Sequence, residues 1–159
     1  MESDGIRDLL VARALWIVRS DAAPTAIDAA TLALVEGIDS EPLRELAGAA
    51  ADTNIFELGA LIEAALNSAG IDVSRLTEDD ALWLVARHCS ECVLRGELQA
   101  REFSGWAHSR IGHEGPSWAQ EIVDLDDRYD DFEGGWGDEP DWIQTLERFL
   151  VASRPIIEK

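Results

Sequence analysis

Basic residues are scarce in this chain. Its 159 residues include 13 Lys and Arg, of which one is Lys, against 32 Asp and Glu, and the formal net charge at pH 7 is −19. Binding to nucleic-acid phosphates depends on clustered Lys and Arg, and so does docking on an anionic membrane. The composition therefore disfavours direct binding to nucleic acid or to a membrane surface.

Long apolar runs and a leader-like segment are also missing. No stretch of about 18 apolar residues is present, which is the length that a membrane-spanning helix needs. The first four residues, MESD, lack the basic and then apolar pattern of a signal peptide. The two cysteines, Cys89 and Cys92, lie three positions apart in a helical stretch, where a disulfide would strain the helix. We therefore expect a cytoplasmic protein with reduced thiols.

Strand patterns and cofactor motifs are absent as well. No segment shows sustained alternation of apolar and polar residues between turn signals. The glycines around Trp136, at positions 134, 135 and 137, lack the Lys and the helix signature of a phosphate-binding loop. We expect no strand and no cofactor.

What the sequence does contain is helical periodicity and enough apolar material for a core. Hydrophobic residues make up 47% of the chain and include six Trp, which favours a folded protein over a disordered one. Apolar spacing predicts helices over about residues 5–20, 24–36, 41–50, 53–67, 78–95, 99–110, 117–131 and 139–153. Ser40 and Thr77 are predicted N-caps. The prediction is an all-α protein, an irregular bundle of seven to eight helices forming a single domain over residues 1–159.

The negative charge is concentrated in one region. Residues 114–147 carry one basic and twelve acidic side chains, whereas residues 75–113 carry five and six. On a helix, Asp126 and Asp130 form a like-charged pair one turn apart, as do Asp127 and Asp131, and each pair costs about 0.2–0.5 kcal/mol. Because local stability does not favour this arrangement, we interpret it as a surface for a basic protein partner, with a solvated helix face as the alternative. The predicted partner-binding residues are Asp124, Asp126, Asp127, Asp130, Asp131, Glu133 and Trp136.

Two magnesium-binding strings offer a different interpretation of the same run. Asp126, Asp127 and Asp130 form a DDxxD string that resembles that of isoprenoid synthases, and carboxylates one turn apart can hold magnesium. Glu121 and Asp124 form an ExxD element similar to that of all-α nucleotide pyrophosphatases. The second metal motif that each of these enzyme classes requires is not found in the sequence.

A zinc site is a further alternative. Cys89 and Cys92 are followed, after fifteen residues, by His108 and His113, which fits Cys2His2 spacing. Zinc fingers take their cysteines from a hairpin and their histidines from one helix, whereas here the cysteines lie in a predicted helix and Gly112 separates the histidines. The other interpretation is that both cysteines are small buried apolar side chains. We expect no bound metal.

The segment 95–104, with the sequence RGELQAREFS, resembles a helix start in small acidic bacterial immunity proteins of the colicin D immunity type. The resemblance covers ten residues. It implies a helical protein that binds and masks a basic, tRNA-cleaving toxin domain, and it assigns no individual site residue.

Together these features predict a non-enzymatic, acidic protein-binding module that masks a basic partner. An immunity or inhibitor protein for a nuclease-type toxin, or for another nucleic-acid-binding protein, would fit. One alternative is a small helical metal-dependent hydrolase that uses carboxylates of residues 121–131, with Asp124, Asp127 and His113 in its site. Another is a structural or oligomeric domain without a site. The sequence leaves the oligomeric state open.

Overall fold

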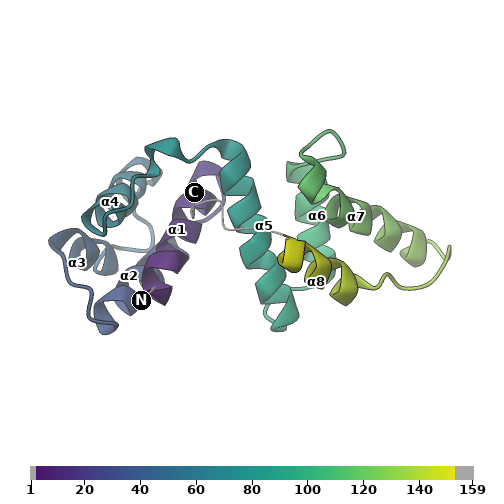
Figure 1. Ribbon diagram of the computed structural model, residues 1–159, viewed down its shortest axis with the longest axis horizontal. Coiled ribbons are helices and arrows are strands. Elements are labelled where there is room, and N and C mark those ends of the chain that lie inside the picture. Colours follow the sequence, from purple (N-terminus) through teal and green to yellow (C-terminus); the bar gives the residue numbers. More distant parts are fainter. Residues whose placement is uncertain (1–2, 153–159) are drawn as a thin grey trace. The chain divides into compact units, whose positions relative to one another are not determined.

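The computed structural model describes residues 3–152, and every regular element in that range is helical (Figure 1). The elements are α1 (Asp4–Ile17), α2 (Ala23–Val35), α3 (Glu41–Ala47), α4 (Ile55–Ser68), the 3-10 turn η1 (Val73–Arg75), α5 (Glu78–Leu94), α6 (Ala100–Arg110), the 3-10 turn η2 (Ser117–Ala119), α7 (Gln120–Glu133) and α8 (Trp142–Ala152). The predicted all-α class, with eight α-helices among these residues, is confirmed. None of the helices in this range has the length and apolar character needed to cross a membrane.

Both predicted N-caps are confirmed. The Ser40 hydroxyl accepts a hydrogen bond from the backbone N–H of Leu43. The Thr77 hydroxyl accepts one from the N–H of Asp80, whose carboxylate in turn accepts one from the N–H of Thr77. This reciprocal pair is a capping box, which satisfies two N–H groups at the start of α5.

The chain divides into two compact units, and the boundary falls between Leu82 and Trp83, inside α5. The first unit contains α1 to α4 and the start of α5. The second contains the rest of α5 and α6 to α8. The single-domain organisation over residues 1–159 stays a prediction.

In the first unit, α1 and α2 pack backbone to backbone. A Cβ atom added to Gly5 would lie 2.4 Å from the backbone nitrogen of Ala33, which is closer than side-chain carbons come. Ala12, Ala26 and Ala30 are also fully buried. Small side chains therefore set the short distance between these two helices.

Two residues satisfy the first N–H groups of α1: Ser3, which precedes the helix, and Glu36, which follows α2. Ser3 is the N-cap of α1, and its hydroxyl accepts a hydrogen bond from the N–H of Ile6. The Glu36 carboxylate accepts hydrogen bonds from the N–H groups of Gly5 and Asp4 and from the Ser3 hydroxyl. These bonds, with that from Gly5 the strongest influence, lower the pKa of Glu36. A carboxylate here also suits the positive end of the helix dipole.

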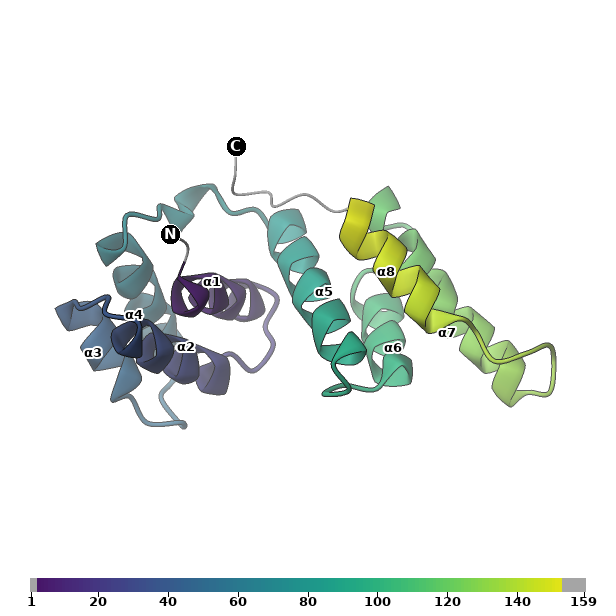
Figure 2. The ribbon, with the colours of Figure 1, turned by 60° about the horizontal axis from the view of Figure 1, so that its bottom comes forward.

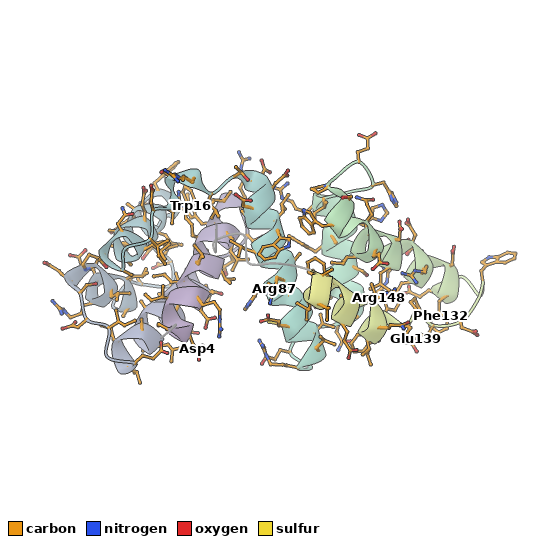
Figure 3. All side chains as sticks on the ribbon, in the orientation of Figure 1. Asp4, Trp16, Arg87, Phe132, Glu139 and Arg148 are labelled. Carbon is orange, nitrogen blue, oxygen red and sulfur yellow. The ribbon has the colours of Figure 1, made fainter. Side chains whose placement is uncertain are left out.

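Trp16 joins α1 to α4 in the same unit (Figure 3). Its indole N–H donates to the Ile55 carbonyl at 2.7 Å. A Cβ atom at Gly59 would lie 2.6 Å from the indole ring, so the ring fits only against a residue without a side chain.

In the second unit, α6 and α7 lie side by side, and a loop leads from α7 into α8 (Figures 1 and 2). Trp118 stacks on Phe149 of α8, with ring centroids 5.9 Å apart. The buried apolar side chains of α6, α7 and α8 are Ala100, Phe103, Ala107, Ile122, Val123, Leu125, Tyr129, Leu146 and Phe149.

The apolar face of α7 is buried over only part of its length. Leu125 and Tyr129 are buried, whereas Phe132, which follows them on the same face, is 39% exposed. All residues from 130 to 139 are exposed. The apolar face of α7 therefore continues past the end of the core.

Candidate functional site

The predicted acidic surface lies on α7, and three basic or titratable groups face it from α6 and the following turn. Arg101 and His108 come from α6, and His113 lies in the turn after it. These residues are distant from α7 in the sequence, so spacing rules for neighbouring residues do not predict the contacts.

Arg101 contacts three of the carboxylates at once. Its Nη1 pairs with Asp126, its Nη2 lies 2.5 Å from Asp130 Oδ1, and its Nε lies 2.7 Å from Glu133 Oε1. The guanidinium also lies over the Tyr129 ring, 5.5 Å from its centroid. These carboxylates follow one stripe of α7, so one cation offsets the like-charge repulsion expected along that stripe.

The histidines contact the remaining carboxylates. His108 Nδ1 lies 2.7 Å from Asp126 Oδ2 and 3.6 Å from Asp127 Oδ1. His113 Nε2 lies 2.8 Å from Asp127 Oδ2, and its Nδ1 lies 3.6 Å from Asp124 Oδ1. The two rings meet edge to face, with centroids 4.9 Å apart. The hydrogen bond to Asp126, aided by the charge of Asp127, raises the pKa of His108.

The turn that carries His113 is held by Gln120, the first residue of α7. The side-chain amide of Gln120 donates to the carbonyls of Gly112, Gly115 and Pro116 at 3.1 to 3.3 Å. Gly112 has a φ of 77°, a conformation that glycine adopts without strain. His113 is therefore presented to α7 by a turn with fixed geometry.

The end of α7 presents Trp136 to solvent. Gly135, with a φ of 87°, donates from its N–H to the Phe132 carbonyl, and the Trp136 N–H donates to the Asp131 carbonyl at 2.7 Å. These two bonds form a Schellman motif. In this motif the second residue after the helix C-cap, here Trp136, often makes an apolar contact with the third residue before the cap, here Asp131. Because Asp131 offers no apolar contact, Trp136 stays 77% exposed.

Of the seven residues predicted to contact a partner, five are exposed and one is not available at the surface. Asp126 is only 8% exposed, because it lies inside the contact between α6 and α7, where it pairs with Arg101 and His108. It holds α6 to α7 instead of facing solvent. Asp127 is half-buried. The five exposed residues are Asp124, Asp130, Asp131, Glu133 and Trp136.

The Cys2His2 combination is not assembled. Among residues 3–152, the groups of side chains close enough to share a metal ion are His108, His113 and Asp127, and separately Asp126, Asp127 and Asp130. Neither includes a cysteine. Cys92 Sγ instead lies 3.5 Å from His88 Nε2, and burial raises the pKa of the Cys89 thiol to about 12.

The residues of the hydrolase alternative do meet, since His113 contacts both Asp124 and Asp127. A neighbouring serine does not complete a nucleophilic site with them. Ser104 is fully buried and its hydroxyl donates to the Arg101 carbonyl. What the cluster can do is hold a proton or a cation between imidazoles and carboxylates.

No protein-family model, curated protein or solved structure matches this chain. The resemblance of residues 95–104 to immunity proteins therefore stays a prediction. That segment forms the turn between α5 and α6 and the beginning of α6.

Proposed function

We propose that this protein is a non-enzymatic binding module that covers the basic surface of a partner protein with the end of α7 and the loop at 134–137. A nuclease-type toxin or another nucleic-acid-binding protein has a surface of the required charge. We call the exposed residues Asp131, Phe132, Glu133 and Trp136 the α7 tip.

The observation that carries the proposal is the exposure of Trp136. A tryptophan that is 77% exposed and lies on a turn closed by backbone hydrogen bonds presents a large apolar surface to water. Phe132 is 39% exposed in the turn before it. Tryptophan is enriched among the residues that contribute most to protein–protein affinity, so the α7 tip suits an interface anchor.

The charge around this anchor supports a basic partner. The run from Asp124 to Glu133 contains six carboxylates, while Arg101 and Arg128 are the arginines on or against it, which leaves a net charge of −4 when both histidines are neutral. Among the described residues nothing pairs with the Asp131 carboxylate. Excess negative charge accelerates association with a cationic surface and competes with nucleic acid for it.

The test is capture of partners from cells that produce the protein, followed by reconstitution of the pair from purified components. We expect a basic partner whose association slows as salt is added, because salt screens long-range attraction. Trp136→Ala should weaken the complex by about 2 kcal/mol, roughly 30-fold in Kd, as for a central interface aromatic. Asp131→Asn should lower mainly the association rate.

Matched controls come from α4 in the first unit. Phe56→Ala removes another exposed aromatic ring, 82% exposed, and Glu63→Gln removes another exposed carboxylate. Both should leave affinity unchanged. A reconstituted complex that tolerates Trp136→Ala and Asp131→Asn as well as it tolerates the controls would contradict the proposal.

A further inference from the structure

We infer that His108, His113 and Asp127 form a binding site for a divalent transition-metal ion of the Zn²⁺ class. This inference does not depend on partner binding, because it concerns the middle of α7 and not the α7 tip.

The three side chains come from separate elements and converge. His108 lies in the last turn of α6, His113 in the turn that follows, and Asp127 in the middle of α7. One ligand atom from each lies within 4.8 Å of the others. Ligands around one tetrahedral zinc ion, at about 2.0–2.2 Å from the metal, lie about 3.3–3.6 Å apart. The cluster therefore needs only small side-chain movements to surround an ion.

A neighbouring carboxylate orients the His108 imidazole as in known metal sites. A metal-bound histidine commonly donates its second N–H to a carboxylate, which fixes the ring. Asp126 is in this position for His108, at 2.7 Å from Nδ1, and is itself held by Arg101. Asp124 Oδ1 lies 3.6 Å from Nδ1 of His113, which is beyond hydrogen-bond distance. Because Nδ1 of His108 contacts Asp126, Nε2 is the nitrogen of that ring left to bind the ion. In His113 the nitrogen nearest Asp127 is Nε2, at 2.8 Å from Asp127 Oδ2.

The ligand types select the class of ion. Imidazole nitrogen with one carboxylate suits zinc and its neighbours in the transition series, whereas magnesium and calcium prefer oxygen alone. The all-oxygen group Asp126, Asp127 and Asp130 is a poorer candidate, because two of its members already pair with Arg101. An ion there would have to displace the guanidinium.

The site has a solvent-exposed side. The side chains of His113 and Asp127 are 50% and 45% exposed. Three protein ligands and solvent access leave a fourth position for water or for a donor from another molecule, which is the arrangement of an open zinc site.

The decisive experiment is a zinc titration of the full chain, followed by calorimetry and by NMR of the imidazole nitrogens. Three histidines are present, so His88, which lies beside Cys92, serves as the internal control. We expect one ion per chain, with changes in the imidazole signals of His108 and His113 and none in those of His88. Added Mg²⁺ should not displace the zinc.

Variants test the ligand set. His113→Gln and Asp127→Asn should each weaken zinc binding at least tenfold, and Asp126→Asn, which removes an orienting carboxylate, about tenfold. His88→Gln and Cys92→Ser should bind zinc as the parent does. Circular dichroism of each variant checks that the helices are retained, and Asp127→Asn gives a second test if His113→Gln does not fold. The inference fails if no saturable binding occurs, if the signals of His108 and His113 do not change, or if Asp127→Asn binds zinc like the parent.

Discussion

In the first unit α1 and α2 are brought together by Gly5 and alanines, whereas in the second unit α6 and α7 add to their buried apolar side chains the ion pairs of Arg101 and His108 with carboxylates. Both units are acidic. Residues 1–82 carry 5 basic and 16 acidic side chains, and residues 83–159 carry 8 and 16. Net charge therefore does not distinguish the two units. What differs is that one helix contact depends on the absence of side chains, whereas the other includes pairs of charged side chains.

This difference has consequences for how each contact can fail. A contact without side chains is insensitive to salt and pH but does not tolerate an added methyl group. A contact made by ion pairs tolerates changes of shape but depends on the protonation and the pairing of its members. The ionic contact in the second unit also leaves carboxylates and imidazoles near the surface, where they can meet a partner or an ion.

The largest expected effect is that of adding one methyl group to the first unit. Gly5→Ala places a Cβ atom where the backbone of Ala33 lies, so we expect a loss of about 3 kcal/mol in the free energy of unfolding, at the upper end for overpacking. The measurement is urea denaturation followed by circular dichroism.

The matched control is Gly105→Ala in α6. A Cβ atom there would meet only Asp126 Oδ1, at an ordinary 3.7 Å. Because alanine is the better helix former, this change should stabilise by up to about 1 kcal/mol. Equal effects of the two substitutions would remove the proposed difference between the units.

The next largest effect is the loss of the central cation of the second unit. Arg101→Leu leaves Asp126 inside the α6–α7 contact without its arginine partner. Breaking a fully buried pair costs about 3–5 kcal/mol, and since the Arg101 side chain is 37% exposed we expect about 2 kcal/mol. Urea denaturation measures it, with Arg128→Leu on the exposed side of α7 as the control.

A double variant tests the reason for that loss. Asp126→Asn in the Arg101→Leu background removes the uncompensated charge, so the pair of substitutions should cost less than the sum of the two single ones. Simple additivity would mean that the Arg101–Asp126 pair does not stabilise the contact.

The smallest effects are opposite responses to pH. The folded-state pKa of His108 is raised, so its contribution is present below the pKa of unfolded histidine and is lost as pH rises through the folded value. The folded-state pKa of Glu36 is lowered, so its contribution is present above the unfolded pKa of glutamate and is lost as pH falls through the folded value. Stability differences between the parent and His108→Gln should shrink toward alkaline pH, and those between the parent and Glu36→Gln toward acid.

Denaturation midpoints measured over a pH series, with a chelator present, test both predicted pH dependences. If the stability differences of His108→Gln and Glu36→Gln changed with pH in the same direction, the contacts of His108 and Glu36 would not shift the two pKa values in opposite directions.

Much of the helical layout was predictable from local sequence. The caps at Ser40 and Thr77 lie where hydroxyl side chains precede helix-forming segments, and they depend only on neighbours three residues away. The start of α8 was less predictable. It was expected near Glu139, but α8 begins at Trp142, where Asp141 accepts a hydrogen bond from the N–H of Gln144. Several carboxylates shortly before Trp142 are possible N-caps, so the local sequence pattern does not determine where α8 begins.

The candidate site was predicted only in part. The acidic run and Trp136 were identified, and His113 was placed with Asp124 and Asp127 in the hydrolase alternative. Arg101 and His108 were not identified as partners of the run. Arg101 is 25 to 32 residues from its carboxylates, and no local spacing rule covers such distances. A sequence signal did exist, since carboxylate pairs that destabilise an isolated helix predict a compensating cation somewhere else.

By itself the sequence determined the helices, the concentration of charge on one of them and the tryptophan in the glycine-rich loop, because periodicity, capping and composition act over a few residues. Only the tertiary structure decided which carboxylates hold α6 and which face solvent, and that two histidines meet at Asp127. Those outcomes depend on how two helices distant in sequence pack against each other, and packing determines which charges are paired, buried or left exposed.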